Sequence, residues 1–178
     1  MQEMKTFDVP RYASPWSRGG RVALLLWEFC WKAFCCWTPK PCNVWRLFWL
    51  KIFGANIFGR PFVHQRARIQ IPWNLTLRDR ACLGDGANAY SLGEIEIHEY
   101  ATVAQEAYLC TGTHDFSSPD QPLQVGKIVI GENAFIGARA FILPGVSVGK
   151  NAVVGACSVV TRDVPAGARV AGNPARVL

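Results

Sequence analysis

One histidine stands where a general base would be expected. The chain has three histidines, His64, His98 and His114, and His114 lies in the stretch Thr-Gly-Thr-His-Asp that spans residues 111–115. An imidazole exchanges protons near neutral pH, so it suits the removal of a proton from a reacting group. His114 also ends a repeat turn just before a long insertion, and functional residues collect in loops on rigid repeats. We therefore predict that His114 is a general base.

A nearby cysteine offers a different chemistry, because a thiolate is a nucleophile. Cys110 precedes His114 by four residues, but it follows the inward-phase Leu109 and is better interpreted as a wall or turn residue. The seven cysteines are an odd number and follow no paired framework, so reduced cytoplasmic thiols are expected. They are Cys30, Cys35, Cys36, Cys42, Cys82, Cys110 and Cys157. The N-terminal sequence shows no secretory signal with a cleavage site.

A six-residue repeat must position these groups. Aliphatic residues recur at every sixth position as Ile130, Ile136, Ile142, Val148, Val154 and Val160, and glycine follows four of them. This period fits neither a helix nor plain strand alternation, so it predicts short strands separated by regular corners, wound into a prism. Stacked coils bury a continuous aliphatic core. The glycines are expected to supply backbone freedom at the bends.

Apolar triplets extend the repeat towards the N-terminus. They begin at Leu75, Ile95, Ile128 and Val146, which predicts three faces of six residues with an insertion of about fifteen residues in one turn. Residues 55–166 are therefore predicted to form about five coils, with an inserted loop at 115–127 and a C-terminal tail at 167–178. The fold class is an all-β repeat with an N-terminal α-helical extension over residues 1–54.

The extension differs from the repeat in composition. Residues 1–60 carry a net charge of +6, which is the whole excess of the chain, together with six of the seven tryptophans. Helices are expected over residues 22–37 and 43–53, and the first is too short and too charged to span a membrane. Trp-rich apolar surface with flanking cations is typical of a helix in the membrane interface. The alternative is that the helices cap the open end of the prism. Nucleic-acid binding is disfavoured, because no recognition motif accompanies the charges.

The C-terminal half resembles a known family. Residues 128–165, followed by Ala171-Gly172-Asn173-Pro174-Ala175-Arg176-Val177, resemble the hexapeptide acyltransferases. Residues 109–115 and 171–177 are most similar to the colanic acid biosynthesis acetyltransferases, relatives of the galactoside and maltose O-acetyltransferases. This resemblance implies a left-handed parallel β-helix that assembles as a homotrimer. The left-handed winding of the β-helix is inferred only from this resemblance.

The resemblance also implies a reaction. His114 would remove the proton from a sugar hydroxyl, which then attacks the thioester of acetyl-CoA directly, without a metal or an acyl-enzyme. A carboxylate or a carbonyl would fix the tautomer of His114. Asp115 and Glu106 are candidates, and the sequence does not rank them. The acceptor would be a sugar of a polysaccharide or a lipid-linked glycan, and the expected location is cytoplasmic, peripheral on the inner face of the cytoplasmic membrane through residues 1–54.

Two groups of binding residues follow by resemblance. The coenzyme A groove would be lined by Gly137, Ala138, Ala156, Thr161, Arg162 and Arg176. Relatives commonly have serine where Ala138 stands, so a side-chain hydrogen bond is lost there while a backbone N–H contact remains. The acceptor would be bound by Asn88, Tyr90 and Asp115, with Asp85 as a weaker candidate.

Other functions compete with this one. An acetyltransferase for serine, a free sugar or an antibiotic would give the extension only a structural role. A γ-class carbonic anhydrase needs three convergent histidines with a close His-x4-His pair, whereas the histidines here are 34 and 16 residues apart. A purely structural β-helix leaves residues 111–115 and Thr161-Arg162 unexplained.

Overall fold

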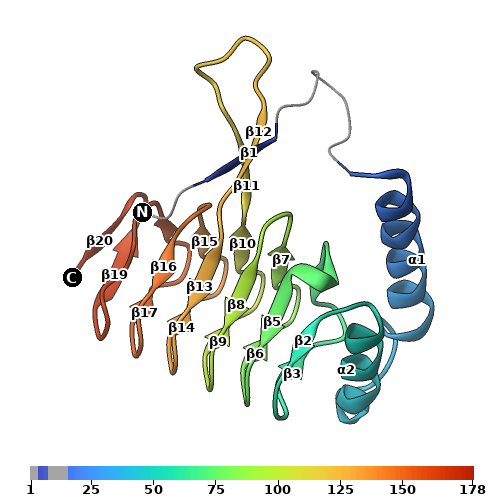
Figure 1. Cartoon of the computed structure of the whole chain (residues 1–178). Helices are drawn as coiled ribbons and strands as arrows, with labels where there is room; N and C mark the ends of the chain where they lie inside the picture. Colours follow the sequence, from blue (N-terminus) through green and yellow to red (C-terminus); the bar gives the residue numbers. More distant parts are fainter. Residues whose placement is uncertain (1–3, 8–15) are drawn as a thin grey trace.

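The repeat forms a three-faced parallel β-helix, as predicted (Figure 1). A computed structural model describes residues 4–7 and 16–178. The first face contains β2 (Asn56–Ile57), β5 (Leu75–Leu77), β8 (Ile95–Ile97), β13 (Ile128–Ile130) and β16 (Ser147–Val148). The second contains β3 (Phe62–Val63), β6 (Cys82–Leu83), β9 (Thr102–Val103), β14 (Phe135–Ile136), β17 (Val153–Val154), β19 (Arg169–Gly172) and β20 (Ala175–Val177). The third contains β4 (Arg68–Ile69), β7 (Asn88–Tyr90), β10 (Tyr108–Cys110), β15 (Phe141–Ile142) and β18 (Val159–Val160).

Inward aliphatic side chains build the core, one column on each face. On the second face the register stacks Val63, Leu83, Val103, Ile136, Val154 and Val170. The six residues that define the repeat, from Ile130 to Val160, are each at most 1 % exposed. Burying one such side chain contributes about 1.5–3 kcal/mol, so the three columns of the core are a main source of stability.

The glycines of the repeat have a different role from the one predicted. Gly131, Gly137, Gly149 and Gly155 are absent from the glycines with positive φ. The left-handed corner residues are instead Asn133, Arg139, Asn151 and Cys157, two positions after each glycine. A Cβ at Gly137 would lie 2.6 Å from the backbone nitrogen of Ala156 in the next coil. Gly131, Gly137 and Gly149 are therefore required by the close approach of the backbone of the next coil, not by backbone freedom.

The β-helix has about six turns, one more than predicted. On the second face, β19 pairs in parallel with β17, so residues 169–172 of the predicted tail continue the stack. β20 then folds back antiparallel on β19 and ends it. The sequence obscured this turn, because its residues depart from the hexapeptide pattern after Val160.

Two helices cover the first coil, as the capping alternative predicted. They are α1 (Arg18–Phe34), with Ser17 as its N-cap, and α2 (Asn43–Ile52), which follows the short 3₁₀ helix η1 (Lys40–Cys42). A further 3₁₀ helix, η2 (Pro72–Asn74), precedes β5. Among the described residues, none of the helices combines the length and apolar character needed to cross a membrane.

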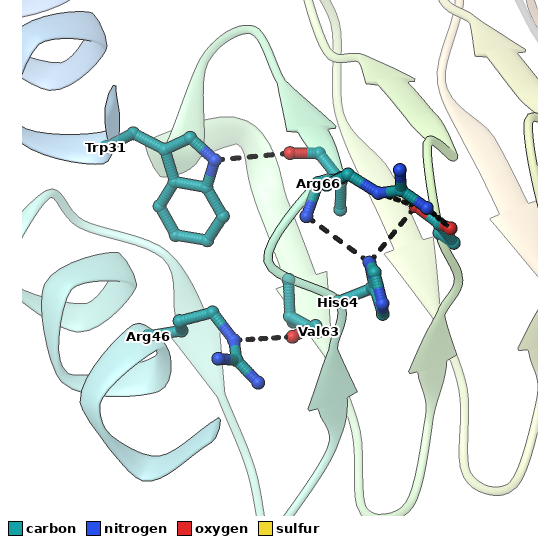
Figure 2. Close-up of polar contacts among 7 residues, drawn as sticks. Trp31, Arg46, Val63, His64 and Arg66 are labelled. Atoms are coloured by element: carbon teal, nitrogen blue, oxygen red, sulfur yellow. Dashed lines mark hydrogen bonds and ion pairs between the residues drawn. The ribbon is translucent and has the colours of Figure 1, made fainter. Parts of the chain in front are cut away.

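Side-chain donors from the helices reach the backbone of the first coil (Figure 2). Trp27 and Trp31 donate their indole N–H groups to the carbonyls of Ile69 and Ala67, at 2.8 and 3.2 Å. Arg46 is fully buried and donates to the Val63 carbonyl at 2.8 Å. Its remaining hydrogen bonds go to Thr38 Oγ1 and the carbonyls of Pro39 and Lys40. Burial lowers the pKa of Arg46, and four acceptors offset the cost of burying its charge.

The insertion projects from the β-helix as a small antiparallel sheet (Figure 1). It consists of β11 (Gly112–His114) and β12 (Leu123–Val125), and β1 (Lys5–Phe7) from the N-terminus pairs with the outer edge of β12. The central strand is therefore β12. The sequence analysis did not predict this sheet.

Candidate functional site

His114 lies at the end of β11, exposed to solvent, with one ring nitrogen fixed. Its Nδ1 is 2.7 Å from the backbone oxygen of Gln121. A carbonyl oxygen only accepts hydrogen bonds, so Nδ1 must carry the proton and donate it. The second nitrogen, Nε2, is then the basic one in the neutral ring. The imidazole is thereby held in the tautomer that a general base requires.

The loop that supplies this carbonyl is built from tight turns. Gln121 has a positive φ of 45°, and its N–H donates to the Ser118 carbonyl at 3.0 Å. The Asp115 N–H donates to the Pro122 carbonyl at 3.0 Å, which closes the loop above the last pair of the hairpin. Backbone geometry therefore places the Gln121 oxygen opposite His114.

The two carboxylates proposed to orient His114 are engaged elsewhere. Asp115 accepts hydrogen bonds from the N–H and hydroxyl of Ser117, at 2.9 and 2.6 Å, and these bonds lower its pKa. Glu106 pairs with Arg139 at 2.6 Å. A carbonyl was the other kind of group expected to fix the tautomer, and the structure identifies it as the backbone carbonyl of Gln121, which residue types alone do not reveal.

The Cys110 thiol is unsuited to nucleophilic attack. Burial raises its pKa, and the thiol donates to the Gly112 carbonyl at 3.2 Å. It therefore stays protonated near neutral pH, and a protonated thiol is a weak nucleophile. This agrees with its interpretation as a wall residue.

Two of the predicted acceptor-binding residues lie on the third face. Asn88 and Tyr90 lie on β7, one coil before β10, and point outward on either side of the buried Ala89. The Tyr90 ring approaches β11, since a Cβ at Gly112 would lie 3.5 Å from it. Tyr90 is therefore close to the hairpin that carries His114. The rings of Tyr90, Tyr108 and Phe141 continue in a row along this face, 5.9 and 4.8 Å apart between centroids.

Asn88 instead lines a polar pocket at the corner between the second and third faces. The lining residues are Arg66, Arg68, Asp85, Gly86, Asn88, Gln105, Glu106 and Tyr108. Within it Asp85 forms an ion pair with Arg66, which lowers the pKa of the carboxyl. Of the predicted acceptor residues, Asn88 and the weaker candidate Asp85 line this pocket, whereas Tyr90 and Asp115 do not.

The predicted coenzyme A residues fall into two groups. Thr161, Arg162 and Arg176 line one pocket near the C-terminal end of the β-helix, where two exposed guanidinium groups face a space suited to phosphate. Gly137, Ala138 and Ala156 lie at the opposite corner of the third face, in two successive coils. There the Cys157 N–H bonds to the Ala138 carbonyl at 2.9 Å, so the coils are in direct contact.

The other two histidines have structural surroundings. His64 is buried, and its Nδ1 lies 3.3 Å from the backbone nitrogen of Arg66 and 3.2 Å from a carboxylate oxygen of Asp85 (Figure 2). His98 Nε2 lies 3.5 Å from a carboxylate oxygen of Glu96. Over residues 4–7 and 16–178, no three His, Cys, Asp or Glu side chains are grouped so as to hold a metal ion.

Known proteins resemble both the sequence and the fold. Residues 127–162 match the model described as a hexapeptide repeat of succinyl-transferase. The chain is 38 % identical, over its full length and 96 % of the relative, to the “Putative colanic acid biosynthesis acetyltransferase WcaF” of Escherichia coli K12. A maltose O-acetyltransferase from Clostridium difficile 630 superposes with a TM-score of 0.77 at 24 % identity, covering 91 % of this chain and 88 % of that one. A hexapeptide-repeat acetyltransferase from Vibrio cholerae, solved with acetyl coenzyme A, gives 0.84 at 19 % identity over 94 % and 91 %.

Proposed function

Because the chain belongs to the hexapeptide-repeat acetyltransferase family, we propose that it transfers acetyl from acetyl-CoA to a sugar hydroxyl in the synthesis of a polysaccharide or its lipid-linked precursor. The observation that carries this proposal is His114, whose Nδ1 is committed to the Gln121 carbonyl so that Nε2 is the basic nitrogen. A relative that matches along the whole chain is named for colanic acid biosynthesis.

The proposed reaction needs one base and no covalent intermediate. Nε2 of His114 accepts the proton of the acceptor hydroxyl while the hydroxyl oxygen attacks the thioester carbonyl carbon. The carbon–sulfur bond then breaks, and the coenzyme A sulfur takes the proton back from His114. The Gln121 oxygen stabilises the transient imidazolium, because it accepts the Nδ1 proton throughout. The net change is an ester on the sugar and a free thiol.

The two pockets suggest how the substrates are held. Arg162 and Arg176 would bind the phosphates of coenzyme A, and Thr161 lies beside them. The small residues Gly137, Ala138 and Ala156 would leave a slot for the thin pantetheine arm. Asn88, Tyr90 and Asp115 remain the proposed acceptor contacts. A homotrimer, as in the family, would set these groups from neighbouring subunits side by side.

The helical extension supports a location at a membrane surface. In α1 an exposed stripe contains Val22, Leu25, Leu26 and Phe29, and in α2 another contains Val44, Trp45 and Phe48. Ring contacts through Phe34 and Trp49 connect the two stripes. We define these seven residues as the outer apolar face, and Leu25 and Phe29 are 68 % and 64 % exposed.

Cations border the outer apolar face. Arg18, Arg21, Lys40 and Lys51 are exposed, while Glu28, the one acidic residue between residues 16 and 60, pairs with Lys32 at 3.6 Å. Apolar surface bordered by unneutralised cations suits anionic lipid headgroups. The proposed location is the inner face of the cytoplasmic membrane, where lipid-linked glycan precursors would be within reach.

An acceptor panel tests the proposed reaction. Purified full-length protein is incubated with acetyl-CoA and, in separate reactions, with polysaccharide fragments, a polyprenyl diphosphate-linked sugar, maltose and serine. Release of coenzyme A thiol, with the acetylated product identified by mass spectrometry, is expected only with the first two. Efficient transfer to serine or maltose would instead support a small soluble acceptor. No release with any acceptor would contradict the proposal.

Vesicle flotation tests the location separately. Full-length protein should float with phosphatidylglycerol vesicles and much less with phosphatidylcholine vesicles. The double variant Leu25→Glu, Phe29→Glu should stay at the bottom, whereas Phe116→Glu, an equally exposed apolar position in the inserted loop, should float normally. If the double variant floats as well as the wild type, the outer apolar face has another role.

A further inference from the structure

We propose that β1, at the N-terminus, is a positioning strand for catalysis: it fixes β12 and thereby the carbonyl that orients His114. This inference rests on the proposed function of His114 as the base. β1 pairs antiparallel with β12 over three residues, Lys5 with Val125, Thr6 with Gln124 and Phe7 with Leu123.

The register links β1 directly to the base. On its other edge β12 pairs with β11, Leu123 opposite His114 and Gln124 opposite Thr113. Phe7, Leu123 and His114 therefore form one row across the three strands. Directly opposed residues in an antiparallel sheet project to the same face, so Phe7 and His114 flank Leu123 on one side. His114 is the last residue of β11, and the loop that follows it returns to β12 through Gln121.

The hairpin needs this support more than the rest of the fold does. An isolated two-stranded hairpin is marginal in water, and a third strand is usually needed for stability. β11 and β12 project from the β-helix, and of their six residues only Val125 is buried. Without β1, the outer edge of β12 would lose its backbone partner. The loop bearing Gln121 would then move relative to β11.

Such movement would act on the tautomer of His114. Within residues 4–7 and 16–178, the polar contact of its ring is the 2.7 Å bond from Nδ1 to the Gln121 oxygen. Gln121 lies two residues before β12 and is joined to it by Pro122. A shift of β12 that lengthens this bond lets the proton occupy either nitrogen, and the fraction of rings with a basic Nε2 falls. The acetyl-CoA pockets lie on the β-helix itself, so their affinity should not change.

The test combines kinetics with a spectroscopic measurement of the tautomer. Two variants disrupt β1: a deletion of residues 1–7, and Lys5→Pro, whose ring fixes φ and removes the backbone N–H at the position paired with Val125. Lys5→Val is the matched control, because valine keeps the backbone N–H and the strand geometry. Gln121→Ala is the second control, because it keeps the backbone oxygen that His114 contacts.

We expect turnover to fall about 10-fold in both disrupting variants, which is a part of the roughly 10²–10⁴-fold that general-base catalysis contributes, with an unchanged KM for acetyl-CoA. Both controls should retain wild-type turnover. Long-range proton–nitrogen spectra of protein labelled with ¹⁵N-histidine should show His114 protonated at Nδ1 in the wild type and as a mixture of tautomers in the two disrupting variants. Melting temperature and trimer mass should stay near the wild-type values.

The experiment separates a failure of the positioning role of β1 from a failure of the proposed function. If the deletion and Lys5→Pro leave both turnover and Nδ1 protonation unchanged, the positioning role of β1 is refuted. If the wild type transfers acetyl to no acceptor in the panel while the tautomer still responds to removal of β1, the proposed function fails and the positioning role stands.

Discussion

The capped end of the β-helix and the projecting hairpin hold a histidine in different surroundings. At the capped end, His64 is buried, and its Nδ1 lies 3.3 Å from the Arg66 backbone nitrogen and 3.2 Å from a carboxylate oxygen of Asp85. In the hairpin, His114 is exposed, and its Nδ1 donates to a backbone carbonyl. Burial lowers the pKa of His64 and encloses its ring, whereas the ring of His114 is accessible from solvent. The fold therefore gives the same residue type two different environments.

The largest expected effect is on the hairpin side of this comparison. His114→Ala should lower turnover by about 10³-fold, because general-base catalysis contributes roughly 10²–10⁴-fold. The thermal midpoint should stay the same, since the side chain is exposed. Thiol-release kinetics and a thermal melt measure the two quantities. His98→Ala is the matched control and should retain activity; retained turnover in His114→Ala would remove this residue from the mechanism.

The next effect belongs to the capped end. Arg46→Met leaves the acceptors at Val63, Thr38, Pro39 and Lys40 without their donor, and it should lower the free energy of unfolding by about 3 kcal/mol. Urea unfolding measures this loss. Turnover per folded molecule should not change, because the helices lie away from the hairpin (Figure 1). Arg60→Met, at an exposed position, should cost little, and an equal loss there would contradict the assignment.

A smaller effect tests the contact between coils. Gly137→Ala places a Cβ 2.6 Å from the Ala156 nitrogen and should cost about 2 kcal/mol, in the usual range for overpacking. Gly19→Ala is the control, because its Cβ meets nothing within 4 Å and alanine favours a helix. Urea midpoints should therefore move in opposite directions. A neutral Gly137→Ala would mean that the coils separate easily.

The smallest effect is the pH response of His64. Burial lowers its pKa below that of the unfolded chain, so between the two values the unfolded state binds more protons. The titration of His64 therefore leaves the free energy of unfolding unchanged above about pH 6.5 and lowers it as the pH falls below that value. Urea unfolding from pH 8 to pH 5 should show this slope, and His64→Gln should flatten it. An unchanged slope in the variant would assign the pH response to other groups.

The sequence was informative wherever the side-chain period reports the fold. The sixfold spacing from Ile130 to Val160 predicted the core. Of the two predicted helices, α2 has nearly the predicted limits, whereas α1 begins four residues and ends three residues before the predicted range 22–37. The β1–β12 pairing was not predicted, because three residues are too few to show a side-chain period and the two strands lie far apart in the sequence. The sequence did not identify Gln121 as the source of the carbonyl, since any residue carries a backbone oxygen and only the turn places it.

The helices at the first coil have a consequence for assembly. A coil of this fold presents carbonyls and amides along its axis, and an uncovered first coil would offer them to the last coil of another molecule. Here Trp27, Trp31 and Arg46 supply side-chain donors to the carbonyls of Ile69, Ala67 and Val63, and Asn43 both donates to Pro61 and accepts from the Val63 N–H. These side chains make hydrogen bonds that the backbone of a preceding coil would otherwise make, and they add no further strand edge. The stack therefore terminates as a discrete molecule instead of growing end to end into a filament.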